Sequence, residues 1–548
     1  MPSLDSFADR HVVIDRRPGH YLCFPDVCLA DDGTILCVYN EFDRHVGTRR
    51  RLLLRTSSDH GRTWSGRRML RADDSHCPRL SALRDGTLCL IDDAGPVILW
   101  STDNGEHWVQ HPGAGLLHGL MDRALELDSQ TLFTAGHQHR GSHPRVKIRQ
   151  APSEQMAYIS RNLGRSWEAL SVIANEKCLV LCEASVIRLP GLCATEPVRS
   201  VGPVDAPEQS GPRVTASAGV PRLLALMREN SFAGEPMYYS ISEDGGINWS
   251  APLPTPLIGH RPTLGWTRSG KLLVTYRDIG ADPGTKAWLG DLDELCSDFA
   301  VHGLHHGAHS PVLTPDGLLV NSADGPDDLV RYFLRPLTDP EFARAEFQAD
   351  VLVRHADENG CGIRLGIWWK LFPDGILPDV TDAEGGAGLV AWEPDRFHTV
   401  RIVYEPGLCR LFIDGEARGA YPVDPLDGDS RPILVGSVSR KTDNACEVVW
   451  RRMALSTSEP RLGREYAWRW DHTEGFPDAY VDTRVLELKN DRLASPADFG
   501  YSGWVETADG EFFCAYHHGG GAEPDYVPGE SSYVLGTWFN EEDFGVLA

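Results

Sequence analysis

Several features that tie proteins to a metal, a membrane or a nucleic acid are missing from this sequence. Its thirteen cysteines are scattered singly without a Cys-x-x-Cys pair, so a zinc site has no support. No run of about 18 apolar residues exists, which argues against a membrane-spanning helix. The net charge of −25 argues against nucleic-acid and anionic-membrane partners. A local arginine cluster can still bind an acidic small molecule, so that class of ligand stays open. We expect no metal and no cofactor.

The cysteines and the first residues favour a reducing compartment. Many cysteines lie in apolar runs such as "LCVY", "LCLI" and "FFCAY", where they act as small hydrophobic residues, and their odd number is typical of reduced thiols. The first residues, "MPSLDSFADRHVV", lack the apolar core of a signal peptide. We therefore expect a cytoplasmic protein, with secretion after removal of a signal peptide as the alternative. With 548 residues and 41% hydrophobic residues, the chain can form a large core and an accessory module.

An octet of the form S-x-D-x-G-x-x-W repeats along the chain. Aspartate in such a stretch bonds nearby backbone N–H groups, glycine takes dihedrals that other residues avoid, and tryptophan packs beside the turn. Three intact copies and one degenerate copy, with Asn162 in the place of the acid, predict a repeated turn. The copies are Ser57–Trp64, Ser101–Trp108, Ser242–Trp249 and the degenerate Ser160–Trp167.

A second repeat has the form of a hairpin, with two apolar strands around an Asp-Gly-like turn. Six copies occur, and the octet follows the hairpin in the first four, which places it between the third and fourth strands of a unit. Six four-stranded units predict an all-β, six-bladed β-propeller. A β-sandwich is the alternative, but it gives no reason for one turn octet to recur. The hairpins are "VCLADDGTILCVY", "RLSALRDGTLCLI", "RALELDSQTLFTA", "ASVIRLPG…PRLLALM", "TLGWTRSGKLLVTY" and "GWVETADGEFFCAY".

The stretch between the fifth and sixth hairpins has a different sequence pattern and lacks the octet. Alternating strands such as "RFHTVRIVYEPGLCRLFIDGEARG" resemble a concanavalin-like jelly roll of the laminin-G type. We predict a β-sandwich inserted between blades five and six, with a carbohydrate-binding role or a spacer or dimer-contact role. The predicted domains are blades one to five at 1–298, the inserted sandwich at 299–464, and blade six with its closure at 465–548. A Pro-, Ser- and Gly-rich insert at Ala194–Gly219 is predicted to be a loop.

A propeller collects functional side chains at the mouth of its central channel, where inner strands begin and second strands end. Charged side chains are costly to bury there unless they are paired, so their number indicates a site for a polar ligand. The candidates are Asp26, Arg79, Asp122, Arg123, Glu183, Arg261 and Tyr501 at inner-strand starts, and Glu41, Asp43, Arg44, Asp92, Asp93, Arg228, Arg277 and His517 after second strands.

Taken together, these features resemble the sialidase superfamily. The octets are similar to its Asp-box (BNR) repeats, which are structural. "YSGWVETADGEFFCAY" resembles the final-blade segment that carries the nucleophilic tyrosine, which implies that role for Tyr501. "EASVIRLPG…LLALMREN" resembles the fourth-blade segment, which implies Glu183 as the group that polarises the tyrosine and Arg228 as a substrate arginine. The loop "YNEFDRHVG" stands in the place of the acid/base aspartate and gives Asp43.

The resemblance implies a retaining exo-glycoside hydrolase with a tyrosine nucleophile acting on a terminal, acidic sugar. A neutral phenol suits an anomeric carbon that bears a carboxylate, and a paired glutamate can take the phenol proton. An aspartate can protonate the leaving oxygen and then activate water. Arginines bind a substrate carboxylate in a bidentate way. The predicted substrate-binding residues are Arg228, Arg261, Arg277, Arg79, Asp122 and His517.

One departure limits the choice of sugar. Sialidases carry a Phe-Arg-Ile-Pro motif in blade one, and its arginine belongs to a three-arginine clamp, whereas this chain has "LCFP" with Cys23 in that place. The clamp is rebuilt from Arg261, Arg277 or Arg79, or the substrate is a uronic acid or a neutral sugar.

Two other classes of function stay open. A lyase for uronate-containing glycans would use a His/Tyr/Arg group, and a propeller that only binds glycans would catalyse nothing. Tyr501 taken alone is more typical of an aromatic residue that packs at the end of a strand, and its pairing with Glu183 and Arg228 favours the catalytic interpretation. A His-rich stretch with His137, His139 and His143 is predicted to be a solvated loop at the rim of the cleft, with metal binding as the alternative. The expected partner is a glycan.

Overall fold

The structure is a computed structural model of the whole chain. It describes residues 1–45, 47–139, 153–190, 219–280, 283–306, 311–322, 329–381, 388–426, 431–439 and 443–545. The α-helices among these residues are short, α1 (Leu292–Leu295) and α2 (Ala479–Arg484). The described 3₁₀ helices are η1 (Ala8–Arg10), η3 (Pro460–Leu462), η4 (His472–Glu474), η5 (Pro496–Asp498) and η6 (Glu541–Asp543). No helix in the described residues has the length and apolar character needed to cross a membrane.

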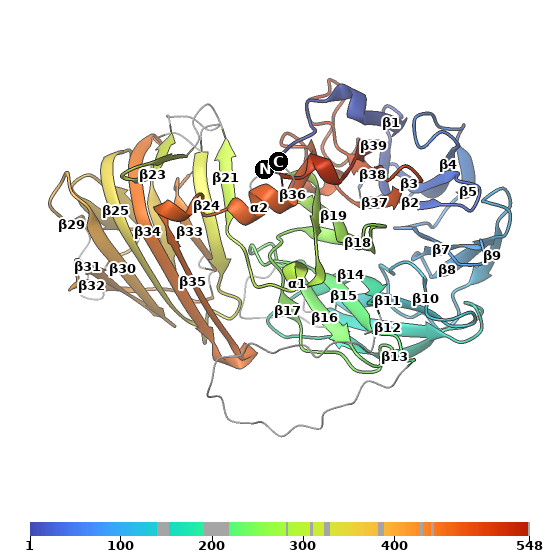
Figure 1. The fold of residues 1–548 in the computed structure, drawn as a ribbon, viewed down its shortest axis with the longest axis horizontal. Helices are drawn as coiled ribbons and strands as arrows, with labels where there is room; N and C mark the ends of the chain where they lie inside the picture. Colours follow the sequence, from blue (N-terminus) through green and yellow to red (C-terminus); the bar gives the residue numbers. More distant parts are fainter. Residues whose placement is uncertain are drawn as a thin grey trace.

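Six antiparallel sheets of four strands surround a common centre, which confirms the predicted six-bladed propeller (Figure 1). In the first four blades the chain runs from the inner strand outward. These blades are β2–β5 (Tyr21–Leu29, Ile35–Phe42, Arg50–Ser57, Arg68–Arg71), β6–β9 (Arg79–Ala82, Leu88–Asp92, Val97–Ser101, Val109–Pro112), β10–β13 (Leu125–Glu126, Leu132–His139, Ser153–Ser160, Glu168–Ala174) and β14–β17 (Leu181–Arg188, Leu223–Glu229, Tyr238–Ser242, Leu253–Pro254).

The last two blades take their outer strands from distant parts of the chain. Blade five consists of β18 (His260–Trp266), β19 (Leu272–Asp278), β20 (Gly284–Gly290) and β36 (Val485–Asn490). Blade six consists of β37 (Ser502–Glu506), β38 (Phe512–His518), β39 (Tyr533–Phe539) and β1 (His11–Asp15). The N-terminal strand β1 pairs with β39 and so closes the ring.

All six predicted hairpins form the first two strands of a blade. The turn of the first shows why its sequence fits. Gly33 takes φ +84°, and the Asp32 side chain accepts a hydrogen bond of 2.9 Å from the Thr34 N–H. Residues with a β-carbon rarely adopt such a φ, so the Asp-Gly pair specifies the turn.

The octets join the third strand to the fourth in blades one to four, as predicted. In the second octet the Ser101 hydroxyl donates to Asp103 over 2.8 Å and accepts from the Gly105 N–H over 2.9 Å. The Asp103 carboxylate also accepts from the His107 N–H over 2.9 Å. Asn162 makes the equivalent contacts in the degenerate copy, which explains why an amide can replace the acid.

Each octet also fastens its blade to the preceding one through its glycine. A β-carbon on Gly246 would stand 2.7 Å from the ring of Phe133 in blade three, and the equivalent glycines meet side chains of the blade before them. The octet therefore serves both as a turn and as a contact between blades.

This packing predicts a large loss of stability for Gly246→Ala. The added methyl must displace the fully buried Phe133 and also adopt φ +92°. Gly270→Ala is a matched control, since Gly270 has φ +85° with no atom within 4 Å of the new β-carbon. We expect denaturant unfolding to show a cost of about 1–2 kcal/mol for the control and about 1–3 kcal/mol more for Gly246→Ala. Equal costs would contradict the contact between blades.

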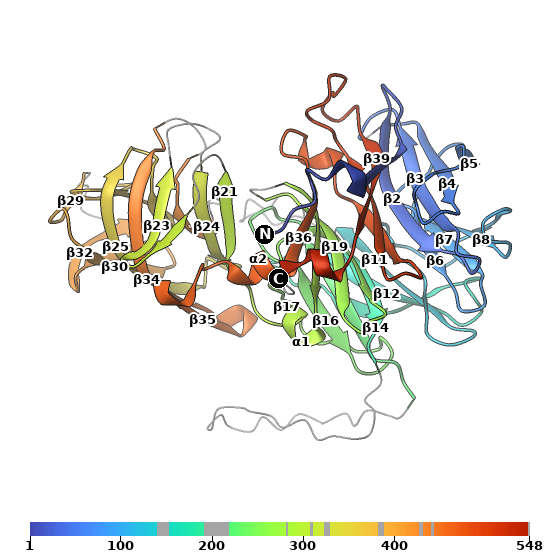
Figure 2. The ribbon, with the colours of Figure 1, turned by 45° about the horizontal axis from the view of Figure 1, so that its top comes forward.

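A second domain follows β20 and consists of two sheets packed around one core (Figures 1 and 2). The seven-stranded sheet has the order β21-β24-β33-β26-β27-β28-β29, and the eight-stranded sheet has the order β22-β23-β34-β25-β30-β31-β32 with β35 beside β34. The strands are β21 (His302–His306), β22 (Val312–Thr314), β23 (Gly317–Ser322), β24 (Leu329–Pro336), β25 (Arg344–Ala356), β26 (Gly362–Leu365), β27 (Ile367–Phe372), β28 (Gly375–Pro378), β29 (Val390–Ala391), β30 (His398–Glu405), β31 (Leu408–Ile413), β32 (Glu416–Pro422), β33 (Pro432–Gly436), β34 (Cys446–Glu459) and β35 (Arg464–Asp471).

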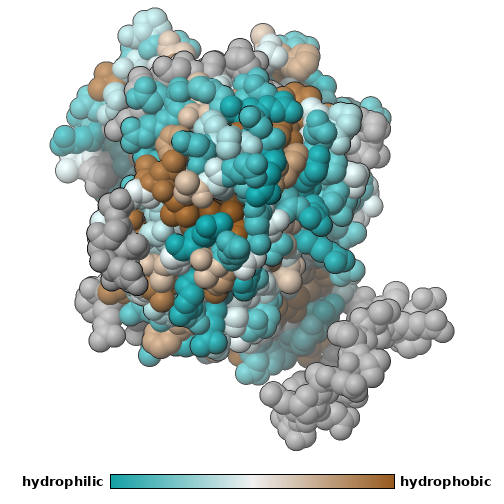
Figure 3. Space-filling model, turned by 90° about the vertical axis from the view of Figure 1, so that its left-hand side faces the viewer, coloured by the Kyte–Doolittle hydropathy of each residue, from teal (hydrophilic) through white to brown (hydrophobic). Residues whose placement is uncertain are grey.

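The strand order places this second domain one strand earlier than the sequence prediction. Because β36 completes blade five, the second domain lies between the third and fourth strands of blade five, not between blades five and six. Strand β35 also carries the sandwich past the predicted end at residue 464. The face of this domain in Figure 3 is mostly hydrophilic, with hydrophobic side chains in several separate patches, as is usual for a solvated surface.

Candidate active site

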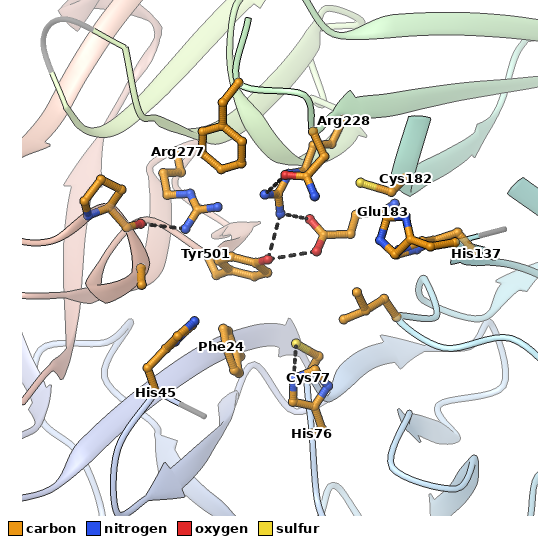
Figure 4. Close-up of a pocket in the computed structure, with 16 residues that line it drawn as sticks. Phe24, His45, His76, Cys77, His137, Cys182, Glu183, Arg228, Arg277 and Tyr501 are labelled. Atoms are coloured by element: carbon orange, nitrogen blue, oxygen red, sulfur yellow. Dashed lines mark hydrogen bonds and ion pairs between the residues drawn. The ribbon is translucent and has the colours of Figure 1, made fainter. Parts of the chain in front are cut away.

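A cavity of about 240 Å³ opens at the mouth of the propeller channel (Figure 4). All six blades contribute side chains to it, and most of these side chains are polar or aromatic. The lining residues are Phe24, His45, His76, Cys77, Leu120, His137, His139, Cys182, Glu183, Arg228, Asn230, Phe232, Arg277, Pro496, Ala497 and Tyr501.

The inner strands present these side chains through a repeated backbone feature. Near the start of each inner strand, from five residues before it to the fourth residue within it, one residue has φ between 44° and 87°. A non-glycine residue in this region costs about 1–2 kcal/mol, and such strain is concentrated at functional sites. Four of the six residues line the cavity, so this strained backbone directs side chains toward the channel mouth. The six residues are Phe24, Cys77, Leu120, Glu183, Arg261 and Gly500.

Tyr501, Glu183 and Arg228 form one buried hydrogen-bonded group at the centre of the cavity (Figure 4). The Tyr501 hydroxyl donates to Glu183 Oε1 over 2.8 Å. Arg228 Nη1 donates to Glu183 Oε2 over 2.6 Å and to Tyr501 Oη over 2.9 Å. The three residues are 4–9% exposed. The fold brings the tyrosine to the glutamate across 318 positions of the sequence. The predicted pairing of Tyr501 with Glu183 and Arg228 is thus present in the structure.

Electrostatics fixes the protonation of this group. Burial alone would raise the pKa of Glu183, but the charges of Arg228 and Arg261 outweigh it and hold that pKa far below its usual value. Burial and the Glu183 charge raise the pKa of Tyr501 above its usual value, against the effect of Arg228. At neutral pH the glutamate is therefore ionised. The tyrosine is a neutral phenol whose hydroxyl donates a hydrogen bond to the glutamate.

Two further guanidinium groups flank the Tyr501 ring. The Arg277 and Arg261 Cζ atoms lie 4.9 Å and 5.3 Å from the ring centroid. Burial lowers the pKa of Arg277 to about 10, which still leaves it protonated at neutral pH. Among the described residues neither arginine forms an ion pair with a carboxylate. Within the part of the chain that the structure describes, Glu183 is the single carboxylate bonded to this group of three arginines, and the surplus positive charge favours an anionic ligand.

The predicted site residues divide into those that line the cavity and those that do not. Tyr501, Glu183, Arg228 and Arg277 line it, and Arg261 lies behind the tyrosine ring, where it donates to the Met121 carbonyl over 3.3 Å. His517 does not line the cavity, because it is fully buried and its ring packs 5.6 Å from that of Tyr501.

Arg79 and Asp122 lie deeper in the channel and do not line the cavity. Arg79 stands 3.5 Å from the Asp26 carboxylate and 3.7 Å from that of Asp122, and each of the three is at most 3% exposed. Asp122 also accepts the Val186 N–H over 2.8 Å. These contacts tie inner strands together. Arg79 and Asp122 were predicted to bind substrate, whereas in the structure they bind each other and neighbouring strands away from the cavity.

Asp43 is also outside the cavity. It is exposed on the loop after β3, where its carboxylate accepts the Arg49 N–H over 3.2 Å. Backbone hydrogen bonds and neighbouring arginines outweigh a small effect of burial and lower the pKa of Asp43, which makes it a poor proton donor at neutral pH. This geometry does not support the predicted acid/base role of Asp43.

Cys23 is fully buried beside Phe24 and Tyr501 and does not line the cavity. No blade-one guanidinium enters the cavity from this position. Among the described residues, Arg228 and Arg277 are the arginines that line the cavity.

Three features of the site were missed from the sequence. Asn230 accepts a hydrogen bond from Arg228 Nη2 and lines the cavity. His76 lines it and bonds Asp93 over 2.8 Å. His137 is not in a solvated loop but at the end of strand β11, where it is 4% exposed and its Nδ1 accepts the Glu183 N–H. The predicted loop residue His143 lies outside the described residues, as does most of the insert at Ala194–Gly219.

The second domain contacts the loop that follows β15 and carries Asn230. Glu235 in that loop is fully buried and forms an ion pair with Arg431 of the second domain. Glu235 also accepts hydrogen bonds from Tyr238 over 2.9 Å and from Thr338 over 3.2 Å. The second domain therefore fixes a segment whose other residues hold Arg228.

This contact predicts that the second domain positions the active site. The double variant Glu235→Gln/Arg431→Met removes both charges, so neither is left buried alone. We expect kcat/KM to fall about tenfold, because a small displacement of Asn230 disturbs Arg228. Arg461→Met is the control, since Arg461 contacts Cys178 of the propeller across the domains but not this loop. Equal activity in both variants would contradict this role.

The described residues contain no group of three or more His, Cys, Asp or Glu side chains that could hold a metal ion.

Solved structures that resemble this chain include sialidases. A protein of unknown function from Dyadobacter fermentans is 12% identical, with 96% of this chain and 97% of that chain covered and a TM-score of 0.44. A Trypanosoma rangeli sialidase in complex with sialic acid is 13% identical, with 81% and 83% covered and a TM-score of 0.34. A Hadza microbial sialidase is 18% identical, with 50% and 54% covered and a TM-score of 0.35. No protein-family model and no curated protein matches the chain.

Proposed function

We propose that this protein is a retaining exo-glycosidase that releases a terminal acidic sugar, with Tyr501 as its nucleophile. The observation that carries the proposal is the buried group in which Tyr501 donates to Glu183 and both accept from Arg228. A buried tyrosine at the end of a strand has no structural need for an ionised glutamate, so this pairing favours a reacting phenol.

The reaction uses the hydrogen bond between the two side chains. As Tyr501 Oη attacks the anomeric carbon, its proton passes to Glu183 Oε1, 2.8 Å away. A neutral phenol approaches a carbon that bears a carboxylate without the repulsion that a carboxylate nucleophile would meet. The bond from the anomeric carbon to the leaving oxygen breaks as the bond to Tyr501 Oη forms, which gives an aryl glycoside of Tyr501. Water then hydrolyses the bond between the anomeric carbon and the tyrosine oxygen, and the proton returns to the phenol.

The substrate carboxylate is proposed to bind Arg228 and Arg277, with Arg261 adding positive charge from behind the ring. Bidentate contacts to guanidinium groups are strong and directional. The cavity volume of about 240 Å³ lies below the roughly 300–1,000 Å³ typical of sites for drug-sized ligands. A single terminal sugar suits this space better than an internal stretch of a glycan.

A lyase that acts on uronate-containing glycans is the second candidate. It is favoured by His76, which lines the same cavity as Tyr501 and Arg277 and is bonded to Asp93. β-Elimination would use one of these groups to remove a proton next to the uronate carboxylate and another to protonate the leaving oxygen.

A screen of sialosides, uronides and neutral glycosides separates these possibilities. A hydrolase of the proposed type releases free sugar whose first-formed anomer, followed by NMR, keeps the configuration of the substrate. An unsaturated product that absorbs in the ultraviolet would establish the lyase and overturn the proposal. Binding without any product after long incubation would indicate a glycan-binding propeller instead.

A further inference from the structure

A retaining hydrolase needs a group that protonates the leaving oxygen, and Asp43 does not line the cavity. His76 does line it, at the start of the inner strand of blade two, next to the left-handed residue Cys77. In Figure 4, Tyr501 and Glu183 lie between Arg228 on one side and His76 with Cys77 on the other. A sugar in the cavity would therefore have His76 on the side away from Arg228.

The contacts of His76 hold its ring in one orientation. Nδ1 bonds the Asp93 carboxylate over 2.8 Å, and Asp93 Oδ2 accepts the Leu120 N–H over 2.6 Å. The His76 backbone N–H donates to Asp92 over 2.9 Å. The ring also stacks on Phe42 with its centroid 6.2 Å away. A carboxylate that orients a histidine through Nδ1 leaves Nε2 as the nitrogen for proton transfer.

Nε2 lies next to Cys77, which lines the cavity together with His76. His76 Nε2 contacts the Cys77 sulfur at 3.8 Å. A thiol is a weak hydrogen-bond partner, which a substrate oxygen can replace. The side chain of His76 is 29% exposed, whereas that of Asp93 is 5% exposed. Substrate can thus reach the histidine while its carboxylate partner stays shielded.

His137 also lines the cavity but is buried, and it is unsuited to this task. Its Nδ1 accepts the Glu183 N–H, and burial together with the charges of His139 and Arg228 lowers its pKa to about 3. For His76, burial favours the neutral ring, but Cys77 and the Asp93 carboxylate outweigh it and raise its pKa to about 11. His76 is accordingly the protonated histidine of the two at neutral pH.

We propose that His76, oriented by Asp93, is the proton donor to the leaving oxygen and then the base that activates water; this inference rests on the proposed function. In the first step the Tyr501 oxygen forms a bond to the anomeric carbon and its proton passes to Glu183. The bond to the leaving oxygen breaks, its electron pair stays on that oxygen, and the proton of His76 Nε2 joins it. In the second step His76 Nε2 takes a proton from water as its oxygen bonds to the anomeric carbon. The tyrosine oxygen leaves and regains its proton from Glu183.

Activity as a function of the leaving group tests this role. The full-length protein and its His76→Gln variant are compared on a para-nitrophenyl glycoside, whose departure needs little protonation, and on a methyl glycoside of the same sugar. We expect a loss of about 10²-fold in kcat/KM on the methyl glycoside and less than tenfold on the nitrophenyl glycoside. Added azide should raise the turnover of the nitrophenyl glycoside by His76→Gln and give a glycosyl azide.

Matched variants make the test specific. Asp93→Asn, which keeps an acceptor for Leu120, should show the same dependence on the leaving group in a weaker form. His107→Gln should behave like the wild type, because His107 is paired with Asp103 over 2.7 Å in an exposed octet. Equal losses of His76→Gln on both glycosides, or the leaving-group pattern appearing in Asp43→Asn instead, would overturn the assignment. Turnover that survives Tyr501→Phe would overturn the proposed function itself, so the two failures are distinguishable.

Discussion

Replacing Tyr501 by phenylalanine is expected to lower kcat/KM by about 10⁴-fold or more, because the variant removes the atom that forms the covalent bond. The ring still packs against Phe24, with a centroid distance of 4.8 Å in the parent protein, so the fold should persist. Glu183 keeps its ion pair with Arg228 and is not left as an isolated buried charge. Steady-state kinetics on the substrate found by the screen, with circular dichroism to check folding, gives the result.

Tyr21→Phe is the matched control for this variant. Tyr21 belongs to the same buried cluster, but its hydroxyl bonds His45 and the Ala497 carbonyl and does not line the cavity. We expect it to keep at least about a third of the parent activity, since the two hydrogen bonds lost, worth about 1 kcal/mol each in stability, involve no reacting atom. Comparable losses in the two variants would show that Tyr501 acts through packing and would contradict a nucleophilic role.

Arg277→Met is expected to raise KM strongly, but only for substrates that carry a carboxylate. Arg277 is 5% exposed, lines the cavity and has no carboxylate partner among the described residues, so a substrate anion is its best partner. Loss of a buried, hydrogen-bonded charge pair costs about 2–5 kcal/mol, which gives a fall in kcat/KM of about 10³-fold. The methyl ester of the same sugar lacks the anion, so on this substrate the kcat/KM of Arg277→Met should fall by less than about tenfold.

The comparison between acid and ester isolates the charge from other effects of the substitution. Arg277 also donates to the Pro496 carbonyl over 2.8 Å, so some disturbance of the loop would affect both substrates alike. Equal losses for acid and ester would contradict carboxylate recognition by Arg277. A neutral sugar as the preferred substrate of the parent protein would contradict it as well.

The propeller was predictable from the sequence because its signals are local. Each octet and each Asp-Gly hairpin specifies a turn within a few residues, and repetition of the two gives the number of blades. The outer strand of blade five was not predictable in this way. Strand β36 pairs with β20 across an entire domain, and no local pattern records which sheet a distant strand will join.

The site was predictable only in part, because sequence indicates position along a strand but not depth in the channel. Arg79 begins an inner strand and Arg277 lies near the end of a second strand, and both were candidates for the channel mouth, yet Arg79 pairs with Asp26 inside the channel and Arg277 lines the cavity. His76 gave no signal, since its partner Asp93 is 17 positions away in another loop. Tyr501 and Glu183 were found through resemblance to family segments, because no spacing rule connects residues 318 positions apart.

The contacts of the second domain with the propeller indicate a positioning role that its sequence did not predict. A spacer or a separate binding module would leave the propeller unaffected. Instead, Arg431 reaches the buried Glu235 of the loop that also carries Asn230, an acceptor for Arg228. Insertion within blade five keeps this domain beside that loop, so catalysis and the second domain are expected to be coupled.

Covalent trapping tests the central claim most directly. A fluoride of the preferred sugar with a second fluorine beside the anomeric carbon should react with the enzyme and hydrolyse slowly. Mass spectrometry of the intact protein and of its peptides then locates the sugar. We predict one sugar per chain, bound to Tyr501 and absent from Tyr501→Phe. An adduct on another residue, or hydrolysis of the natural substrate with no adduct at Tyr501, would contradict the account.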